Sequence, residues 1–96
     1  MMEEAIAMEL FNEVKHQLNT KLVGYTHRNQ ILSDLLNSSL FKSSDIMIID
    51  MMLQNRNIDN IKHILLYTTS GITEKLMYIN ETIKCFEPKL NKTISL

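Results

Sequence analysis

The stretch Ile46-Met47-Ile48-Ile49-Asp50-Met51-Met52-Leu53 decides the fold, because seven of its eight residues are apolar. A helix of this composition is apolar all the way round, so it must be covered on more than one side. Several short helices could cover it at the centre of a bundle, whereas a two-helix hairpin would leave an apolar patch that needs a partner. The alternative for so short an apolar run is a core strand. No partner strand is evident elsewhere in the sequence, so the stretch favours a helical bundle.

Length and composition limit what can surround this stretch. The chain has 96 residues, of which 45% are apolar, so it can form one modest core and is not disordered throughout. Two glycines and one proline are too few for the many tight turns of an all-β fold. We therefore expect a single all-α domain over residues 1–96, with residues 89–96 as a frayed tail.

The part of the chain before this stretch has the spacing of a long helix. Its stripe proceeds in steps of three or four through Ala7, Phe11, Val14, Leu18, Leu22, Tyr25, Asn29, Leu32 and Leu36, all of them apolar except Asn29. The pattern favours one helix of about 35 residues from Glu3 to Ser38. The alternative is two helices broken near Thr20–Thr26, where Gly24 weakens the helix.

Asn29 is the polar position of that stripe, between Tyr25 and Leu32. A single buried Asn in an apolar seam can set register and oligomeric state, and we assign Asn29 this role as a hypothesis. The alternative places it at the exposed edge of the stripe.

The second half of the chain favours several short helices. After a loop at residues 37–44, Ser43 or Ser44 is a candidate N-cap, and a stripe with steps of three or four runs from Met47 to Phe86. Two places within it have capping chemistry, Asn57 and the pair Thr69 and Ser70, so we favour short helices over one long helix.

Charges indicate how the helices are arranged. Residues 1–14 carry four carboxylates and no Lys or Arg, whereas Lys84, Lys89 and Lys92 lie near the other end. In an antiparallel arrangement these clusters would face each other; the alternative is that they meet between two chains. We therefore predict a small antiparallel bundle of three to five helices with a long N-terminal helix.

The residues that usually carry chemistry form no recognisable site. The histidines and the lone cysteine lack the short paired spacings of zinc sites; they are His16, His27, His63 and Cys85. The two glycines, Gly24 and Gly71, are isolated, so the sequence contains no phosphate-binding loop. We expect no enzyme activity, metal, cofactor or small-molecule substrate, and we expect the thiol of Cys85 to be buried.

Gly-Ile-Thr at residues 71–73 resembles the turn of helix-turn-helix regulators. The resemblance implies a turn at residues 69–71 between two helices and an alternative function, that of a small DNA-binding transcription regulator using residues 61–84. Two glutamates, Glu74 and Glu81, lie on the would-be recognition helix, and the formal net charge of the chain is −1, which disfavours nucleic acid as a partner.

The remaining functional class is a protein that binds another protein or a second copy of itself, and we expect a homo-oligomer such as a homodimer. Examples of this class are a small adaptor, a chaperone-like cover and an inhibitor of a bacterial or viral regulatory protein. We predict that a helix face at residues 46–53 packs against a partner helix. The predicted interface residues are Ile46, Met47, Ile49, Met51, Met52 and Leu53. Methionine suits adaptable interfaces, although it also fills cores.

The acidic start, the single cysteine and the lack of a long apolar run predict a cytoplasmic protein with no membrane segment.

Overall fold

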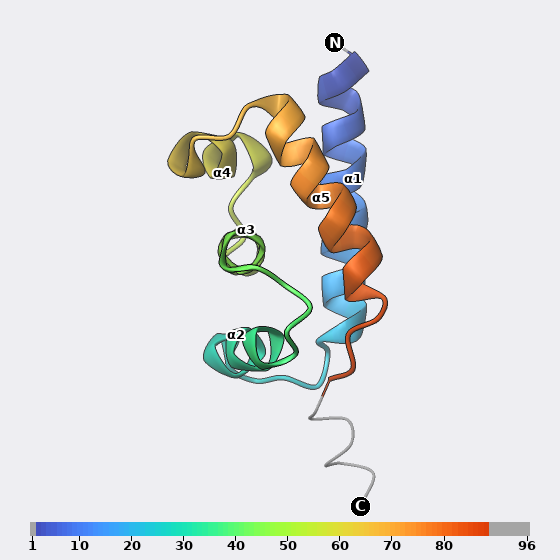
Figure 1. Ribbon diagram of the computed structural model, residues 1–96, viewed down its shortest axis with the longest axis vertical. Coiled ribbons are helices and arrows are strands. Elements are labelled where there is room, and N and C mark those ends of the chain that lie inside the picture. The colour runs from blue at the N-terminus through green and yellow to red at the C-terminus, as the bar shows by residue number, and fades with distance from the viewer. Residues whose placement is uncertain (1, 89–96) are drawn as a thin grey trace, which may run out of the picture.

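The computed structural model describes residues 2–88, in which the chain forms five helices and no strand. The helices are α1 (Met2–Lys21), α2 (Arg28–Asn37), α3 (Ser43–Leu53), α4 (Ile58–Leu65) and α5 (Thr69–Ile83) (Figure 1). The all-helical fold and the long N-terminal helix are confirmed. The expected frayed tail, residues 89–96, lies outside the described residues.

The first helix is shorter than the stripe predicts. It ends at Lys21, a connection follows, and α2 starts at Arg28. The prediction of one helix to Ser38 is therefore wrong, and the break near Thr20–Thr26 is correct. The connection also changes the phase of the apolar stripe: Ile31 and Leu35 are buried, whereas Leu36 is 58% exposed. A stripe extrapolated across a break follows the wrong face of the second helix.

Helices α1 and α5 lie side by side and run in the same direction (Figure 1). Asn80 donates a hydrogen bond to Glu13, and the ammonium of Lys21 donates to the carbonyls of Lys84 and Phe86 at 3.1 and 2.8 Å. The expected antiparallel arrangement is therefore wrong for this pair.

An antiparallel pair does occur where the connection is short. Helices α2 and α3 form a hairpin in which Arg28 Nε lies 3.2 Å from Asp50 Oδ1. The parallel α1–α5 pair does not bring the acidic start of the chain to Lys84. This lysine, the C-cap of α5, pairs instead with Glu81 of that helix. Lys89 and Lys92 lie outside the described residues.

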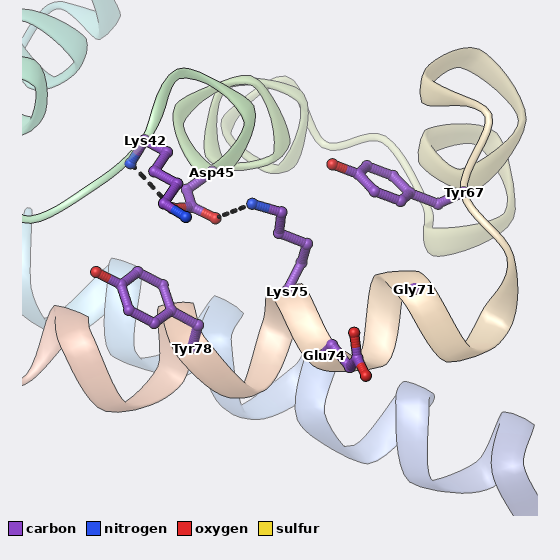
Figure 2. Close-up of a pocket in the computed structure, with 7 residues that line it drawn as sticks. All are labelled: Lys42, Asp45, Tyr67, Gly71, Glu74, Lys75 and Tyr78. Atoms are coloured by element: carbon purple, nitrogen blue, oxygen red, sulfur yellow. Dashed lines mark hydrogen bonds and ion pairs between the residues drawn. The ribbon is translucent and has the colours of Figure 1, made fainter.

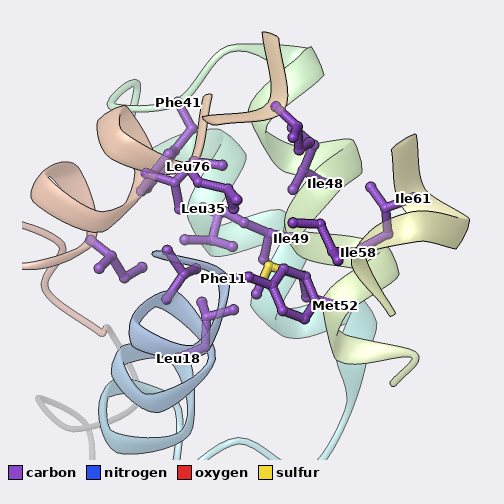
Figure 3. Close-up of a cluster of buried hydrophobic side chains, with 14 of the residues drawn as sticks. Phe11, Leu18, Leu35, Phe41, Ile48, Ile49, Met52, Ile58, Ile61 and Leu76 are labelled. Carbon is purple, nitrogen blue, oxygen red and sulfur yellow. The ribbon is translucent and has the colours of Figure 1, made fainter. Parts of the chain in front are cut away.

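Helix α3 lies at the centre of the bundle. Figure 1 shows it nearly end on, between α2, α4 and the α1–α5 pair. Its inner side chains Ile48, Ile49 and Met52 are buried. Figure 3 shows them among core residues of the other four helices, which include Phe11, Leu18, Leu35, Ile58, Ile61 and Leu76. The sequence argument that an apolar helix needs cover on several sides is confirmed.

The short helices of the second half begin at specific caps. Asn57 caps α4 by accepting from the amide of Asn60 at 2.8 Å, as predicted. Thr68 caps α5 by accepting from Gly71 at 3.0 Å, one residue before the predicted Thr69 or Ser70.

The N-cap of α3 also differs from the prediction. The N-cap is Lys42 rather than Ser43 or Ser44, and the carboxylate of Asp45 accepts from the Lys42 amide at 3.0 Å. A carboxylate at the third helical position thus accepts from the N-cap amide, which is the bond that the acidic residue of a capping box makes.

Candidate functional site

The predicted interface divides into an inner and an outer part. Ile49 and Met52 lie in the core, with 0% and 4% exposure. They are unavailable to a partner in the folded chain, so for these two residues the core alternative holds. The physical reason is the central position of α3, whose inner side has to fill the space between four other helices.

The other four predicted residues form what we call the outer face of α3, defined as Ile46, Met47, Met51 and Leu53. Met47 is 50% exposed, and the other three are partly buried. On the adjacent α2, Leu36 is also exposed. The apolar stretch therefore supplies the core from one side of the helix and still presents apolar atoms to solvent from the other.

Asn29 is exposed near the start of α2. It does not lie in a buried seam of this chain, which agrees with the alternative of an exposed edge. A register role for Asn29 would have to operate between chains and stays a prediction.

A pocket between α3 and α5, which we call the α3–α5 pocket, was not predicted from the sequence. Its volume is about 350 Å³, and it is lined by Lys42, Asp45, Tyr67, Gly71, Glu74, Lys75 and Tyr78. Figure 2 shows Lys42 and Tyr78 at one end of the pocket and Tyr67 and Glu74 toward the other. No sequence motif marks it, because its residues come from the start of α3, the α4–α5 connection and one side of α5.

The centre of the α3–α5 pocket is a charge pair joining the two helices. Asp45 is 1% exposed, and its Oδ1 atom lies 3.0 Å from Lys75 Nζ. The same ammonium donates to Ser44 Oγ at 2.6 Å. Tyr78 donates to the carbonyl of Leu40 at 2.6 Å. These contacts hold the first turn of α3 against α5, so the pocket is framed by fixed side chains.

A second hollow lies between α1 and α5 and has a polar lining that includes Glu9, Glu13, His16 and Asn80. Asn80 Oδ1 is buried there and has no hydrogen-bond partner within residues 2–88. The side chain nevertheless keeps one bond, from Nδ2 to Glu13 at 3.3 Å. Over the described range, no three His, Cys, Asp or Glu side chains come together as a metal site.

The structure differs from the helix-turn-helix resemblance in the position of the turn. The connection between α4 and α5 is Leu66–Thr68, and Gly71 lies inside the first turn of α5 rather than in the turn. The predicted turn at residues 69–71 is therefore wrong. Both glutamates of the would-be recognition helix, Glu74 and Glu81, are exposed.

Two other sequence expectations can be compared with the structure. Cys85 is exposed, so the expected burial of its thiol is wrong. None of the helices in residues 2–88 has both the length and the apolar character that crossing a bilayer requires.

Comparison of the chain with protein-family models, curated proteins and solved structures gave no match.

Proposed function

We propose that this protein is a non-enzymatic protein–protein interaction module that contacts its partner through the outer face of α3. The observation that carries the proposal is the exposure of Met47 on a helix whose opposite side is fully buried. The core holds α3 in place, so its outer face is a preorganised surface on a regular element. Preorganisation lowers the entropy lost when two proteins associate.

The chemistry of the outer face supports a protein partner. Met47 and Met51 have flexible, polarisable side chains that can adapt to another apolar surface. Leu36 adds a further exposed apolar side chain on the neighbouring helix. The Arg28–Asp50 ion pair joins these same two helices, and polar groups beside apolar anchors are typical of protein interfaces.

A displayed library of random peptides, selected on the immobilised chain, tests the proposal. Peptides that bind the wild type should lose binding to Met47→Glu, because a charge on the outer face has to be desolvated on association. Met77→Glu is the matched control, since Met77 on α5 is 54% exposed and similarly solvated. Failure to select any peptide, or selection of peptides that bind Met47→Glu and the wild type equally, would overturn the proposal.

The alternative function, a DNA-binding regulator using residues 61–84, has weaker support. The exposed side of α5 carries Glu74 and Glu81, and the ammonium of Lys75 is paired with Asp45. A gel shift with mixed DNA at low salt separates the two functions, because phosphate contacts are strongest under those conditions. We expect no shifted band.

A further inference from the structure

We infer that two copies of this chain associate face to face across the α3–α5 pocket, as a symmetric dimer. This surface is distinct from the outer face of α3, so the inference goes beyond the proposed function. Three observations support it: the distribution of charge along the pocket, the exposed leucine side chain at position 66, and the position of the tyrosines.

The first observation concerns Lys42 and Glu74. They lie toward opposite ends of the α3–α5 pocket (Figure 2), both are exposed, and neither forms an ion pair within residues 2–88. In a two-fold dimer the same surface is used by both subunits, so one end of it meets the other end in the partner. Lys42 of each copy would then face Glu74 of the second copy.

The rest of the lining does not oppose this arrangement. The other two charges, Asp45 and Lys75, neutralise each other at the centre of the α3–α5 pocket. With Lys42 and Glu74 included, the lining carries two positive and two negative side chains. Two copies therefore approach without net repulsion, and the end-to-end polarity selects the two-fold orientation.

The second observation is Leu66, in the α4–α5 connection next to Tyr67 of the pocket. It has the left-handed conformation, with φ 60° and ψ 41°, and it is 88% exposed. Glycine or asparagine usually occupies this position at a helix end, because a β-carbon there is sterically strained. Within one chain, this conformation ends α4 and lets the amide of Tyr67 donate to the carbonyl of Lys62 at 2.9 Å, but that role does not need a leucine side chain. In the two-fold dimer, it lies at the end that meets Tyr78 of the second copy.

The third observation is that tyrosine stands at both ends of the pocket, Tyr67 toward one and Tyr78 toward the other. Tyr78 is 46% exposed although its hydroxyl is bonded to the Leu40 carbonyl, so its ring is held in place and accessible. Rigid aromatic rings give large contact area with little loss of side-chain entropy, and tyrosine is enriched at protein interfaces.

Charge reversal with analytical ultracentrifugation tests the dimer. The wild-type chain should show a reversible monomer–dimer equilibrium. Lys42→Glu and Glu74→Lys should each raise the dissociation constant by about tenfold or more, because each substitution turns two symmetry-related attractions into repulsions. Glu4→Lys, which makes the same charge change as Glu74→Lys at an exposed position on α1, should leave the constant unchanged.

The two-fold symmetry also predicts the behaviour of a mixture of the two charge-reversal variants. An equimolar mixture of Lys42→Glu and Glu74→Lys should dimerise as the wild type does, because each copy then offers the charges that the other needs. The double variant should also recover. Leu66→Asn should weaken the dimer while circular dichroism shows an intact fold, since asparagine tolerates the left-handed conformation.

Some results would overturn the inference. They are a wild-type chain that stays monomeric at its highest soluble concentration, a dimer that ignores the charge reversals, and mixed variants that do not recover. Met47→Glu should leave the dimer intact, and Lys42→Glu should leave peptide binding at the outer face intact. Failure of the dimer can thus be told apart from failure of the proposed function.

Discussion

Lys75 on α5 lies 3.0 Å from the carboxylate of Asp45 in the first turn of α3, and the carboxylate is almost completely buried. Asp45 also accepts from the Lys42 amide, so one side chain caps a helix and joins it to another. A carboxylate in this position is stable only while its partners remain, because a buried charge without compensation is strongly unfavourable.

Removal of the ammonium should therefore destabilise the fold. We expect Lys75→Met to lower the free energy of unfolding by about 1.5–3 kcal/mol, the range for charge-assisted hydrogen bonds. Lys84→Met is the matched control: Lys84 pairs with Glu81 on the exposed surface, and its loss should cost less than about 1 kcal/mol. Urea unfolding followed by circular dichroism measures both. Equal effects would show that the Asp45–Lys75 pair contributes no more than a surface pair.

Truncation of a side chain should lower stability much more on the inner side of α3 than on its outer face. Ile49→Ala removes a fully buried side chain and should cost about 2–5 kcal/mol. Met47→Ala, on the outer face of α3, should change stability by less than about 0.5 kcal/mol. Thermal and urea unfolding of both variants test this division. A large loss for Met47→Ala would mean that its side chain supports the core.

Left-handed residues at helix ends provide a pair of reciprocal substitutions. Leu66 and Asn55 have φ values of 60° and 67°. Leu66→Asn should raise the free energy of unfolding by roughly 1 kcal/mol, and Asn55→Leu should lower it by a similar amount, because asparagine tolerates this conformation better. The measurement is the unfolding midpoint at a protein concentration below that of any dimer. Destabilisation by Leu66→Asn would contradict the strain argument.

The caps make a further prediction. Asn57→Ala and Thr68→Ala should each cost about 1 kcal/mol, since each removes a side-chain acceptor for an otherwise unpaired amide at a helix start. Ser43→Ala should have little effect, because Asp45 provides the capping bond of α3. Hydrogen exchange at the first turns of α3, α4 and α5 locates the changes. A loss of protection at α3 in Ser43→Ala would restore the serine as its cap.

Local chemistry in the sequence predicted much of the fold. The apolar run at residues 46–53 required cover on several sides, and Asn57 identified the start of α4, because both arguments depend only on neighbouring residues. The phase of an apolar stripe was predictable within a helix but not across a break. That is why Ala7, Phe11 and Val14 were placed correctly and Leu36 was not.

Helix direction and the α3–α5 pocket could not be predicted in this way. Whether α1 and α5 run parallel depends on the path of the three helices between them. No local sequence pattern indicates that path. The α3–α5 pocket likewise combines Lys42 with Tyr67 and Glu74 from separate segments. In the apolar run at residues 46–53, the same composition was compatible with core and interface, and only the position of α3 separated the buried Ile49 from the exposed Met47.

The parallel pairing of α1 with α5 has a consequence for synthesis of the chain. The apolar side of α1, with Phe11, Val14 and Leu18, emerges from the ribosome well before the helix that lies against it. Pairings of high sequence separation slow folding, because a long loop has to close before the contact forms. Until α5 is available, the nascent chain leaves the apolar side of α1 without the helix that covers it, and in that interval it is most open to aggregation or to a chaperone.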